Sequence, residues 1–271
     1  MPDITSTRSP RVAAVRRLTR RSARVAGRRF VVEGPQAVRE ALAYGHLLEL
    51  FHEPGRQNDL VAAARAAGTP VTEVSATVLE AMAQTVTPQG VLGVAGLLDV
   101  PLEAVQAPRL VAVLDVVNDP GNAGTVLRTA DAAGADAVVL TEGSVDPHNG
   151  KCVRATAGSL WHLPVVSAVP LGQALAHLRA QGLQILATTG GGDSDLDVLA
   201  DDGTLAAPTA WLFGPEAAGL SAEALAAADR RVRIPIVGRA ESLNLAAAAA
   251  VCLYATARAH RKTAPGPGRQ P

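Results

Sequence analysis

Short apolar runs alternate with Ala-rich amphipathic stretches through the second half of the chain. Six apolar runs are predicted to be strands, at residues 110–116, 137–140, 165–166, 184–187, 210–213 and 232–236. Strands that alternate with helices are typical of a parallel sheet covered by helices. The last helix is expected from Ser242 to about Arg261, and the run Ala246–Ala250 makes it too apolar for a surface helix. We therefore predict that it is buried, with a second subunit as one candidate for its cover.

The first half shows a shorter version of the same alternation. A strand is expected at residues 29–34, a helix at 35–44, strands at 48–52 and 91–97, and helices at 59–67 and 76–84. The predicted fold class is α/β, with a small N-terminal domain at 1–98 and a parallel-sheet domain at 110–262. Residues 99–109 contain two prolines and are the expected linker, and 263–271 are expected to form a disordered tail.

Charge is distributed unevenly along the chain although the net charge is zero. Residues 1–30 hold nine arginines but only one acidic residue, Asp3. A concentrated arginine segment in a neutral protein predicts a local contact with a polyanion, and phosphate contacts of this kind give affinity without reading sequence. A mitochondrial transit peptide and a merely solvated helix face are the two alternatives.

Composition excludes several classes of protein. No apolar run approaches the roughly 20 residues that span a membrane. The two cysteines, Cys152 and Cys252, are too few for a disulfide framework and form no CxxC pair, and the six histidines are scattered. We therefore expect no membrane, no metal and a reducing, cytoplasmic location.

Ligands of parallel sheets bind beyond the carboxyl ends of the strands, which directs attention to the turn after residue 116. There Asn118-Asp119-Pro120-Gly121-Asn122-Ala123-Gly124 precedes a helix that contains Arg128. Glycines permit close approach of a ligand to the backbone, and helix N-termini favour anions. The segment lacks the G-x-G-x-x-G spacing of a dinucleotide site, which argues against a dehydrogenase. Taken alone, the turn could be a simple helix cap, and Arg128 could pair with Asp131.

Two later turns carry further polar residues after predicted strands. Glu216 follows Phe213-Gly214-Pro215 and could merely stabilise the next helix through its dipole. Ser242 is suited to be the N-cap of the last helix. Asn244 would then lie in the first turn of a very apolar helix, where its amide requires a partner.

These segments, in this order and spacing, resemble the signature motifs of the SpoU/TrmH methyltransferases, which are N-x-G-x-x-x-R, F-G-x-E-x-x-G and I-P-M-x-G-x-x-E-S-L-N. The matching residues are Asn122, Gly124 and Arg128, then Phe213, Gly214, Glu216 and Gly219, then Ile234, Pro235, Gly238, Glu241, Ser242, Leu243 and Asn244. Ile236 replaces the family's Met. Residues 151–159 resemble the family's K-x-x-R-x-S-x-G-S, with Thr156 in place of the first Ser. The first half resembles the family's accessory RNA-binding domain through its F-V-V-E-G segment, Glu40-Ala41-Leu42 and Pro88-Gln89-Gly90.

The resemblance implies a SPOUT domain with a deep trefoil knot, a homodimer, and S-adenosylmethionine as cofactor. It implies methyl transfer to a ribose 2′-hydroxyl of RNA, with ribosomal RNA favoured over tRNA. A tRNA ribose methyltransferase and a non-catalytic RNA-binding or ribosome-assembly protein are the alternatives. The catalytic residues it implies are Arg128, Asn122, Glu216, Ser242 and Asn244. The cofactor-binding residues are Thr188, Thr189, Gly190, Phe213, Gly214, Ile234, Ile236 and Leu243. The RNA-binding residues are Arg8, Arg11, Arg16, Arg17, Arg20, Arg21, Arg29, Lys151 and Arg154.

Overall fold

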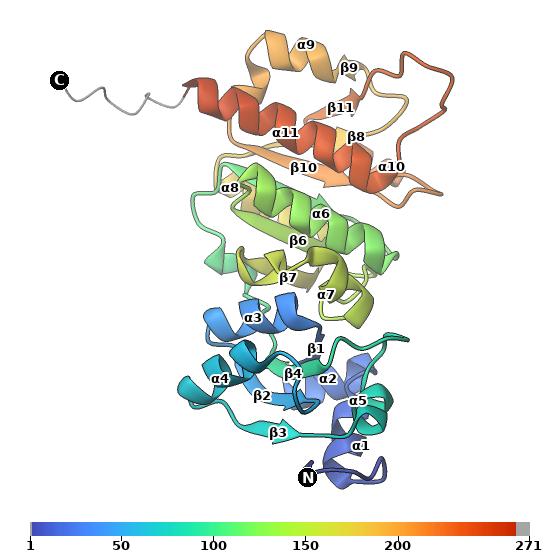
Figure 1. Cartoon of the computed structure of the whole chain (residues 1–271). Helices are drawn as coiled ribbons and strands as arrows, with labels where there is room; N and C mark the ends of the chain where they lie inside the picture. Colours follow the sequence, from blue (N-terminus) through green and yellow to red (C-terminus); the bar gives the residue numbers. More distant parts are fainter. Residues whose placement is uncertain (1, 264–271) are drawn as a thin grey trace, which may run out of the picture. The chain divides into compact units, whose positions relative to one another are not determined.

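The computed structural model describes residues 2–263, and the chain forms two compact units (Figure 1). The first unit contains the chain up to Leu98 together with Asp146–His162. The second unit contains Asp99–Val145 and the chain from Leu163 onward. The segment Asp146–His162 therefore packs with the N-terminal unit although it lies in the middle of the predicted parallel-sheet domain. Most of the predicted tail, residues 264–271, lies outside the described residues.

The second unit is built on a parallel sheet of seven strands in the order β7-β6-β5-β10-β8-β11-β9. The strands are β5 (Leu110–Leu114), β6 (Ala137–Thr141), β7 (Val165–Val169), β8 (Gln184–Thr188), β9 (Ser194–Asp195), β10 (Thr209–Phe213) and β11 (Arg230–Arg233). Three adjacent inner strands, β6, β5 and β10, are buried along their whole length, as expected for strands covered on both faces. This confirms the α/β class and the parallel sheet.

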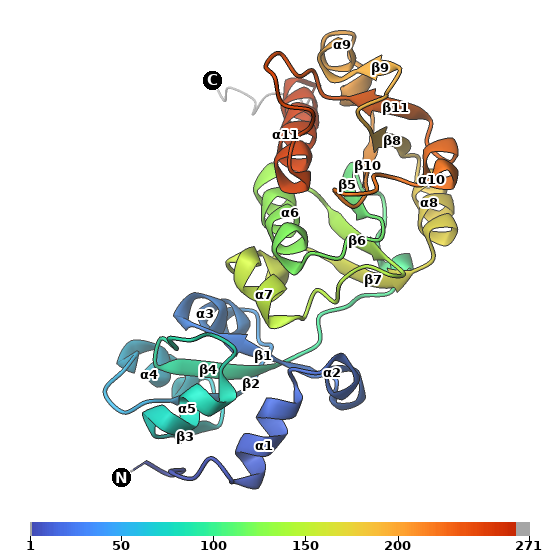
Figure 2. The ribbon, with the colours of Figure 1, turned by 90° about the vertical axis from the view of Figure 1, so that its right-hand side faces the viewer.

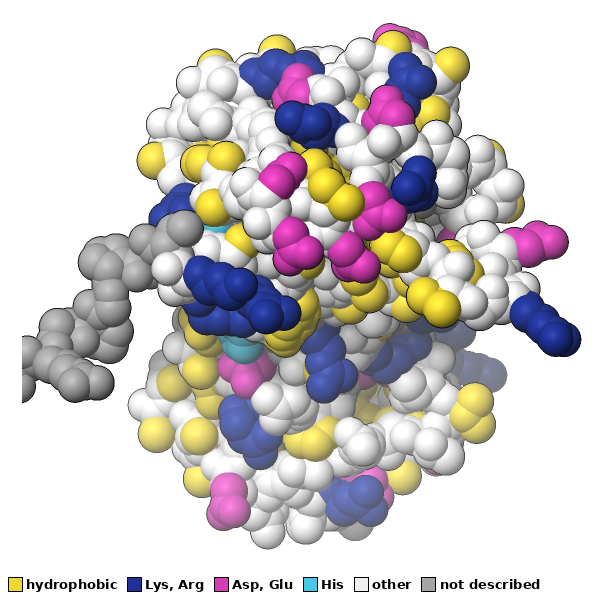
Figure 3. Space-filling model, turned by 90° about the horizontal axis from the view of Figure 1, so that it is seen from above, with side chains coloured by type: hydrophobic (Ala, Val, Ile, Leu, Met, Phe, Trp, Pro, Cys, Tyr) yellow, Lys and Arg dark blue, Asp and Glu magenta, His cyan; other side chains and the backbone are white. Residues whose placement is uncertain are grey.

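Helices cover both faces of this sheet (Figure 2). The helices α6 (Pro120–Ala133) and α11 (Leu245–Thr263) pack together on one face, against β5 and β10. The helices α8 (Leu171–Ala180) and α10 (Ala222–Ala226) lie on the other face, and α9 (Leu196–Asp201) lies near the edge formed by β11 and β9. The end of the unit that carries α9 has acidic and basic side chains interspersed, with neither sign dominant (Figure 3).

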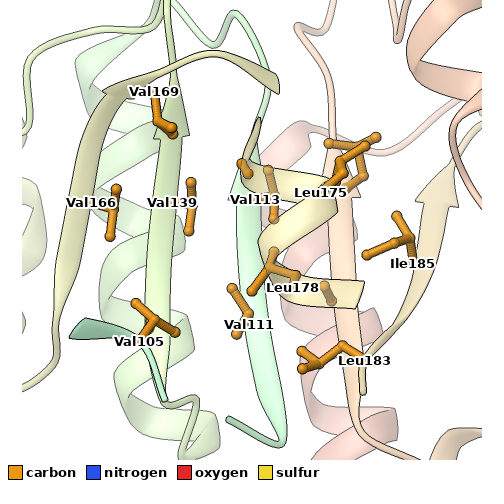
Figure 4. Close-up of a cluster of buried hydrophobic side chains, with 14 of the residues drawn as sticks. Val105, Val111, Val113, Val139, Val166, Val169, Leu175, Leu178, Leu183 and Ile185 are labelled. Atoms are coloured by element: carbon orange, nitrogen blue, oxygen red, sulfur yellow. The ribbon is translucent and has the colours of Figure 1, made fainter. Parts of the chain in front are cut away.

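The core between α8 and the sheet is aliphatic (Figure 4). Leu175 and Leu178 of α8 meet side chains of β5, β6 and β8 there. Leu102 and Val105 belong to the same cluster, and they are only 5% and 3% exposed. Residues 99–109, predicted to be a linker, thus include a short 3₁₀ turn, Leu102–Ala104, that is anchored in the core. The prolines on which the linker prediction was based do not indicate that Leu102 and Val105 are buried.

The first unit has a mixed sheet of four strands in the order β1-β4-β2-β3. The strands are β1 (Arg29–Glu33), β2 (Leu47–His52), β3 (Val71–Glu73) and β4 (Val91–Gly96), and the helices are α1 (Pro10–Arg17), α2 (Arg21–Gly27), α3 (Pro35–Ala43), α4 (Asn58–Ala66), α5 (Ala76–Met82) and α7 (Gly150–Thr156). Val12, Val15 and Leu18, on and just after α1, pack with α5 and the sheet in one core cluster. The arginine-rich segment is therefore part of the folded unit.

Element boundaries differ from the sequence prediction at two places that matter for the site. The strand predicted at 232–236 ends at Arg233, because Pro235 has no N–H for the ladder. The last helix begins at Leu245, three residues after the predicted start. The loop between them, residues 234–244, is longer than expected. The described residues contain no helix that is both long and apolar enough to cross a membrane.

Candidate active site

A pocket opens at the carboxyl ends of β8, β10 and β11, in the second unit. Its walls come from Thr188–Gly190, from the turn after β10, from the loop 234–244 and from the start of α11. Its empty volume, including the open mouth, is about 780 Å³. This place, beyond the carboxyl ends of parallel strands, is where such sheets bind small molecules.

The predicted cofactor-binding residues converge on this pocket. Seven of the eight line it, namely Thr188, Thr189, Gly190, Gly214, Ile234, Ile236 and Leu243. The exception is Phe213, whose side chain is fully buried and stacks with Trp211. The carbonyl of Phe213 accepts a hydrogen bond from the backbone N–H of Asp115. The side chain of Phe213 is therefore part of the core, and the residue that follows it, Gly214, lines the pocket.

The sequence prediction missed several wall residues. They are Pro215, Gly219, Leu220, Val232, Glu241, Leu245 and Ala248. Glu241 and Gly219 stood in the matched motifs, so motif membership was the available signal for them. Gly214 has a packing reason to be glycine, because a Cβ there would lie 2.7 Å from the backbone nitrogen of Leu220.

Three of the predicted catalytic side chains form one hydrogen-bonded group beside the pocket. The Nδ2 of Asn244 donates to Oδ1 of Asn122 at 3.2 Å and also to Oε1 of Glu216. The same Glu216 oxygen accepts from the backbone N–H of Leu245 at 2.9 Å. The group joins α6, the turn after β10 and the start of α11, which come from three distant parts of the sequence.

Helix caps explain how this group is positioned. The carboxylate of Asp119 accepts the N–H of Asn122 and so begins α6, with Pro120 in the first turn. Asn244 begins α11, because its Oδ1 accepts from Ala246 at 2.9 Å and from Ala247 at 3.3 Å. The sequence interpretation of Ser242 as the cap was wrong, since the helix starts after Asn244. Ser242 instead lines the pocket.

Arg128 lies two turns further along α6. Its side chain is exposed, and it makes no recorded hydrogen bond or ion pair within residues 2–263. The pairing of Arg128 with Asp131 that the spacing allowed is therefore not found. Because its guanidinium is exposed and has no partner among residues 2–263, it is available for an anionic ligand.

The loop before α6 has a strained residue that the sequence did not indicate. Val116 has φ of 53° and is 42% exposed, a conformation that β-branched residues rarely adopt. Hydroxyl groups hold this loop: Thr141 donates to the buried carboxylate of Asp115 at 2.8 Å and accepts from the N–H of Val116 at 3.1 Å. Backbone strain at a site is typical of functional loops.

The arginines of the first unit divide into two kinds. Arg8, Arg16, Arg17, Arg20, Arg21 and Arg28 are exposed. Arg11 is also exposed but pairs with Glu49, and Arg29 is exposed with a hydrogen bond to the carbonyl of Gly27. Arg24 is only 3% exposed and was not among the predicted RNA contacts.

Arg24 has a structural role. It donates to Oδ2 of Asp146 at 2.6 and 2.9 Å and to the carbonyls of Leu18 and Thr19 at 2.9 Å. The Nδ1 of His148 lies 3.3 Å from the other Asp146 oxygen. Burial by itself would raise the pKa of the Asp146 carboxyl, but the hydrogen bonds from His148 and Arg24 outweigh it and hold that pKa well below its usual value. This network anchors the segment that begins at Asp146.

The segment 146–162 also carries the two predicted RNA contacts outside the N-terminus. Lys151 is exposed, and Arg154 is half-buried with its Nη1 at 3.4 Å from Oε2 of Glu33. Both lie on α7 in the first unit.

Neither cysteine has the exposure of a reactive thiol. Cys152 and Cys252 are both buried, and burial raises the pKa of the Cys252 thiol. Within residues 2–263 no group of three or more His, Cys, Asp or Glu side chains is arranged to hold a metal ion.

Fold and site together define a parallel α/β domain with a ligand pocket at its carboxyl edge, joined to a basic unit. Residues 109–254 match the SpoU rRNA Methylase family, and residues 9–93 match the MRM3-like substrate binding domain. The 23S rRNA (guanosine(2553)-2'-O)-methyltransferase RlmP of Bacillus subtilis (strain 168) is 34% identical over 257 residues, which are 94% of this chain and 98% of the relative.

Two solved structures with bound AdoMet are similar along most of the chain. The AdoMet-bound rRNA methyltransferase from Sinorhizobium meliloti has a TM-score of 0.83 and 35% identity, covering 94% of this chain and 97% of the other. The SpoU methyltransferase AviRb from Streptomyces viridochromogenes, in complex with AdoMet, has a TM-score of 0.83 and 27% identity, covering 94% and 100%. The chain belongs to the SpoU rRNA methylase family, and it is an RNA methyltransferase.

Proposed function

We propose that this protein transfers a methyl group from S-adenosylmethionine to a ribose 2′-hydroxyl of ribosomal RNA. The observation that carries the proposal is the hydrogen-bonded group Asn122–Asn244–Glu216 beside the pocket, whose Glu216 also lines it. Arg128, on the same helix as Asn122, has no partner among residues 2–263. The names of the relatives support 23S rRNA as the substrate. A tRNA substrate is the second candidate.

The pocket residues fit the cofactor by their chemistry. Thr188, Ser242 and backbone groups near Gly190 and Gly214 offer hydrogen bonds, and Ile234 and Ile236 offer apolar walls. The sulfonium of S-adenosylmethionine supplies an activated methyl group, so the protein's part is positioning.

Arg128 acts on the RNA. An arginine stays protonated and is a poor base; we infer that it binds the phosphate next to the target ribose and stabilises the developing alkoxide. Asn122, Glu216, Asn244 and Ser242 orient the ribose and Arg128.

We also propose that the enzyme is a cytoplasmic homodimer whose second unit contains a trefoil knot. The family resemblance supports both features. A second support for the dimer is α11, which the sequence predicts to be buried but whose Val251 and Tyr254 are 41% and 47% exposed in the single chain. A partner subunit that covers these side chains would remove this discrepancy.

The test is transfer of labelled methyl from S-adenosylmethionine to unmodified large-subunit rRNA and, separately, to unmodified tRNA. We expect alkali-stable label in the rRNA, as a ribose methyl would give. Label only in tRNA would select the second candidate. Absence of both transfer and cofactor binding would instead favour a non-catalytic RNA-binding protein.

A further inference from the structure

The first unit contains a pocket of its own. It lies where β1 ends and where the loop 83–90 enters β4, and Arg154 of α7 completes it. Its empty volume is about 630 Å³. All of its wall residues belong to the first unit. We refer to it as the Glu33 pocket.

An almost buried carboxylate lies in this pocket. The side chain of Glu33 is 6% exposed, and its Oε1 accepts the N–H of Gln84 at 2.6 Å while its Oε2 is 3.4 Å from Nη1 of Arg154. Each carboxylate oxygen has two lone pairs, so both can accept one more hydrogen bond. The carboxylate of Glu33 can therefore accept hydrogen bonds from the N–H groups of a ligand.

The guanidinium beside it has unused donors. Arg154 is 32% exposed, and only its Nη1 has a recorded partner within residues 2–263. An arginine has five N–H donors in a planar fork that suits phosphate. The pocket therefore places an acceptor and an anion-binding group next to each other.

The loop that forms the other wall is held in place by backbone contacts. The N–H of Glu53 donates to the carbonyl of Gly90 at 3.0 Å, and that of Gly34 donates to Val91 at 3.4 Å. Gly90 has φ of 81°, and a Cβ there would lie 2.7 Å from Cβ of Arg56. Thr87 and Gln89 of this loop are exposed and present a hydroxyl and an amide to the pocket.

We propose that the Glu33 pocket binds one unpaired nucleotide of the RNA substrate, with the N–H edge of the base on Glu33 and a phosphate on Arg154. This inference rests on the proposed function. An RNA occupant is favoured because the same unit presents exposed arginines at positions 16, 17, 20 and 21. The nucleotide must be unpaired, since pairing would occupy the base edge that Glu33 accepts.

The acceptor pair also predicts which base fits. Guanine has two adjacent N–H donors, on N1 and N2, which match the two carboxylate oxygens. Uracil has a single N–H between two carbonyl oxygens, and these would face the carboxylate. We therefore expect guanine to bind better than uracil.

Two bulky substitutions in one loop provide the test. Thr87→Trp fills the pocket, whereas Val86→Trp alters a neighbouring side chain that is 98% exposed and does not line it. The probe is a single-stranded RNA of about twelve adenosines with one central guanosine, and the measurement is the Kd by fluorescence anisotropy with full-length protein. We expect Thr87→Trp to weaken binding about tenfold and Val86→Trp less than about twofold, in the range of one base–protein contact. Thermal unfolding checks that both variants fold.

Exchange of the central guanosine for uridine gives a second readout. This exchange should raise the Kd of the unaltered protein for the probe. It should leave the Kd of the Thr87→Trp variant unchanged. Arg154→Ala should lower the slope of log Kd against log salt by about one, while Arg154→Lys retains it.

Equal affinity of Thr87→Trp and the unaltered protein, or no discrimination of guanosine from uridine, would overturn the inference. Failure of the unaltered protein to bind the probe would overturn it as well. Methyl transfer to rRNA, measured in parallel, shows whether the proposed function survives when the pocket inference does not.

Discussion

Two arginines, one in each unit, differ in burial and in hydrogen-bond partners. In the second unit, Arg128 is exposed and unpaired within the described residues, on the same helix as Asn122 of the hydrogen-bonded group Asn122–Asn244–Glu216. In the first unit, Arg24 is buried and bonds a carboxylate and two carbonyls. A guanidinium whose donors are satisfied inside the fold has none left for a ligand. Burial and partners, more than charge, therefore indicate which arginines are available to bind a ligand.

The largest expected effect comes from Arg128→Ala. We expect the rate of methyl transfer to fall about 10³-fold, because a donor aimed at developing charge is worth this much in other enzymes. Labelled-methyl transfer to rRNA at saturating cofactor measures it. The control is Arg179→Ala, which removes an exposed arginine from α8 on the opposite face of the sheet. Full activity of Arg128→Ala would refute the assignment of this residue.

Arg24→Ala should act on stability instead. The side chains of Arg24 and Asp146 are 4% and 12% exposed, and removal of Arg24 leaves the almost buried carboxylate of Asp146 with His148 as its remaining partner in the network. We expect the free energy of unfolding to drop by about 3 kcal/mol, measured by urea titration. Arg21→Ala, at a neighbouring exposed arginine, should leave the unfolding midpoint unchanged.

The pH dependence of stability should report the same network. The pKa of Asp146 is lowered in the folded state, so its contribution is present above the unfolded-state value of about 3.9 and is lost as pH falls through the folded pKa. Asp146→Asn should therefore be less stable at neutral pH but lose less stability between about pH 4 and pH 2. Parallel acid-denaturation curves for the two proteins would contradict this.

Single substitutions of the exposed arginines should have smaller effects. Arg16→Ala, Arg17→Ala and Arg20→Ala are each expected to raise the Kd for rRNA fragments about three- to tenfold and to lower the salt slope by up to about one. Binding of S-adenosylmethionine, followed by calorimetry, should not change. Loss of cofactor binding would mean that these residues support the fold of the enzyme.

The smallest expected effect is a gain in stability. Val116→Gly relieves a positive φ that costs roughly 1–3 kcal/mol in a non-glycine residue, and after the entropic cost of glycine we expect a net gain of about 1 kcal/mol. Val198→Gly is the matched control, because Val198 is 59% exposed in the helix α9 and glycine there should destabilise. Equal destabilisation by both substitutions would show that Val116 is not strained.

The sequence predicted the second unit well because its signals are local. The six predicted runs are all strands, and the turns after 188, 213 and 233 do meet at one pocket. It missed β9 of this unit, which has two residues, and β3 of the first unit, which has three, because such short strands carry no periodicity. The sequence predicted that Asn244 lies within the first turn of the last helix, whereas Asn244 is the residue that caps this helix. The position of a cap depends on where the preceding loop ends, which the sequence pattern does not show.

The first unit was harder to predict because its structure depends on distant partners. Nothing adjacent to Arg24 in the sequence shows that Asp146 will bond it 122 positions later. The Glu33–Arg154 pair spans 121 positions. Composition indicated a basic segment, and only the fold separated its exposed arginines from the buried one.

The excursion Asp146–His162 has a consequence for how such a protein can change over time. The chain passes from one unit to the other three times, after Leu98, after Val145 and after His162. A recombination event with a single crossover near residue 98 would combine residues 1–98 of one protein with the segment 146–162 of another. Arg24 and Glu33 would then face the other protein's residues at positions 146 and 154 in place of their own partners. We therefore expect that RNA specificity can be exchanged between relatives only when residues 146–162 are transferred together with residues 1–98.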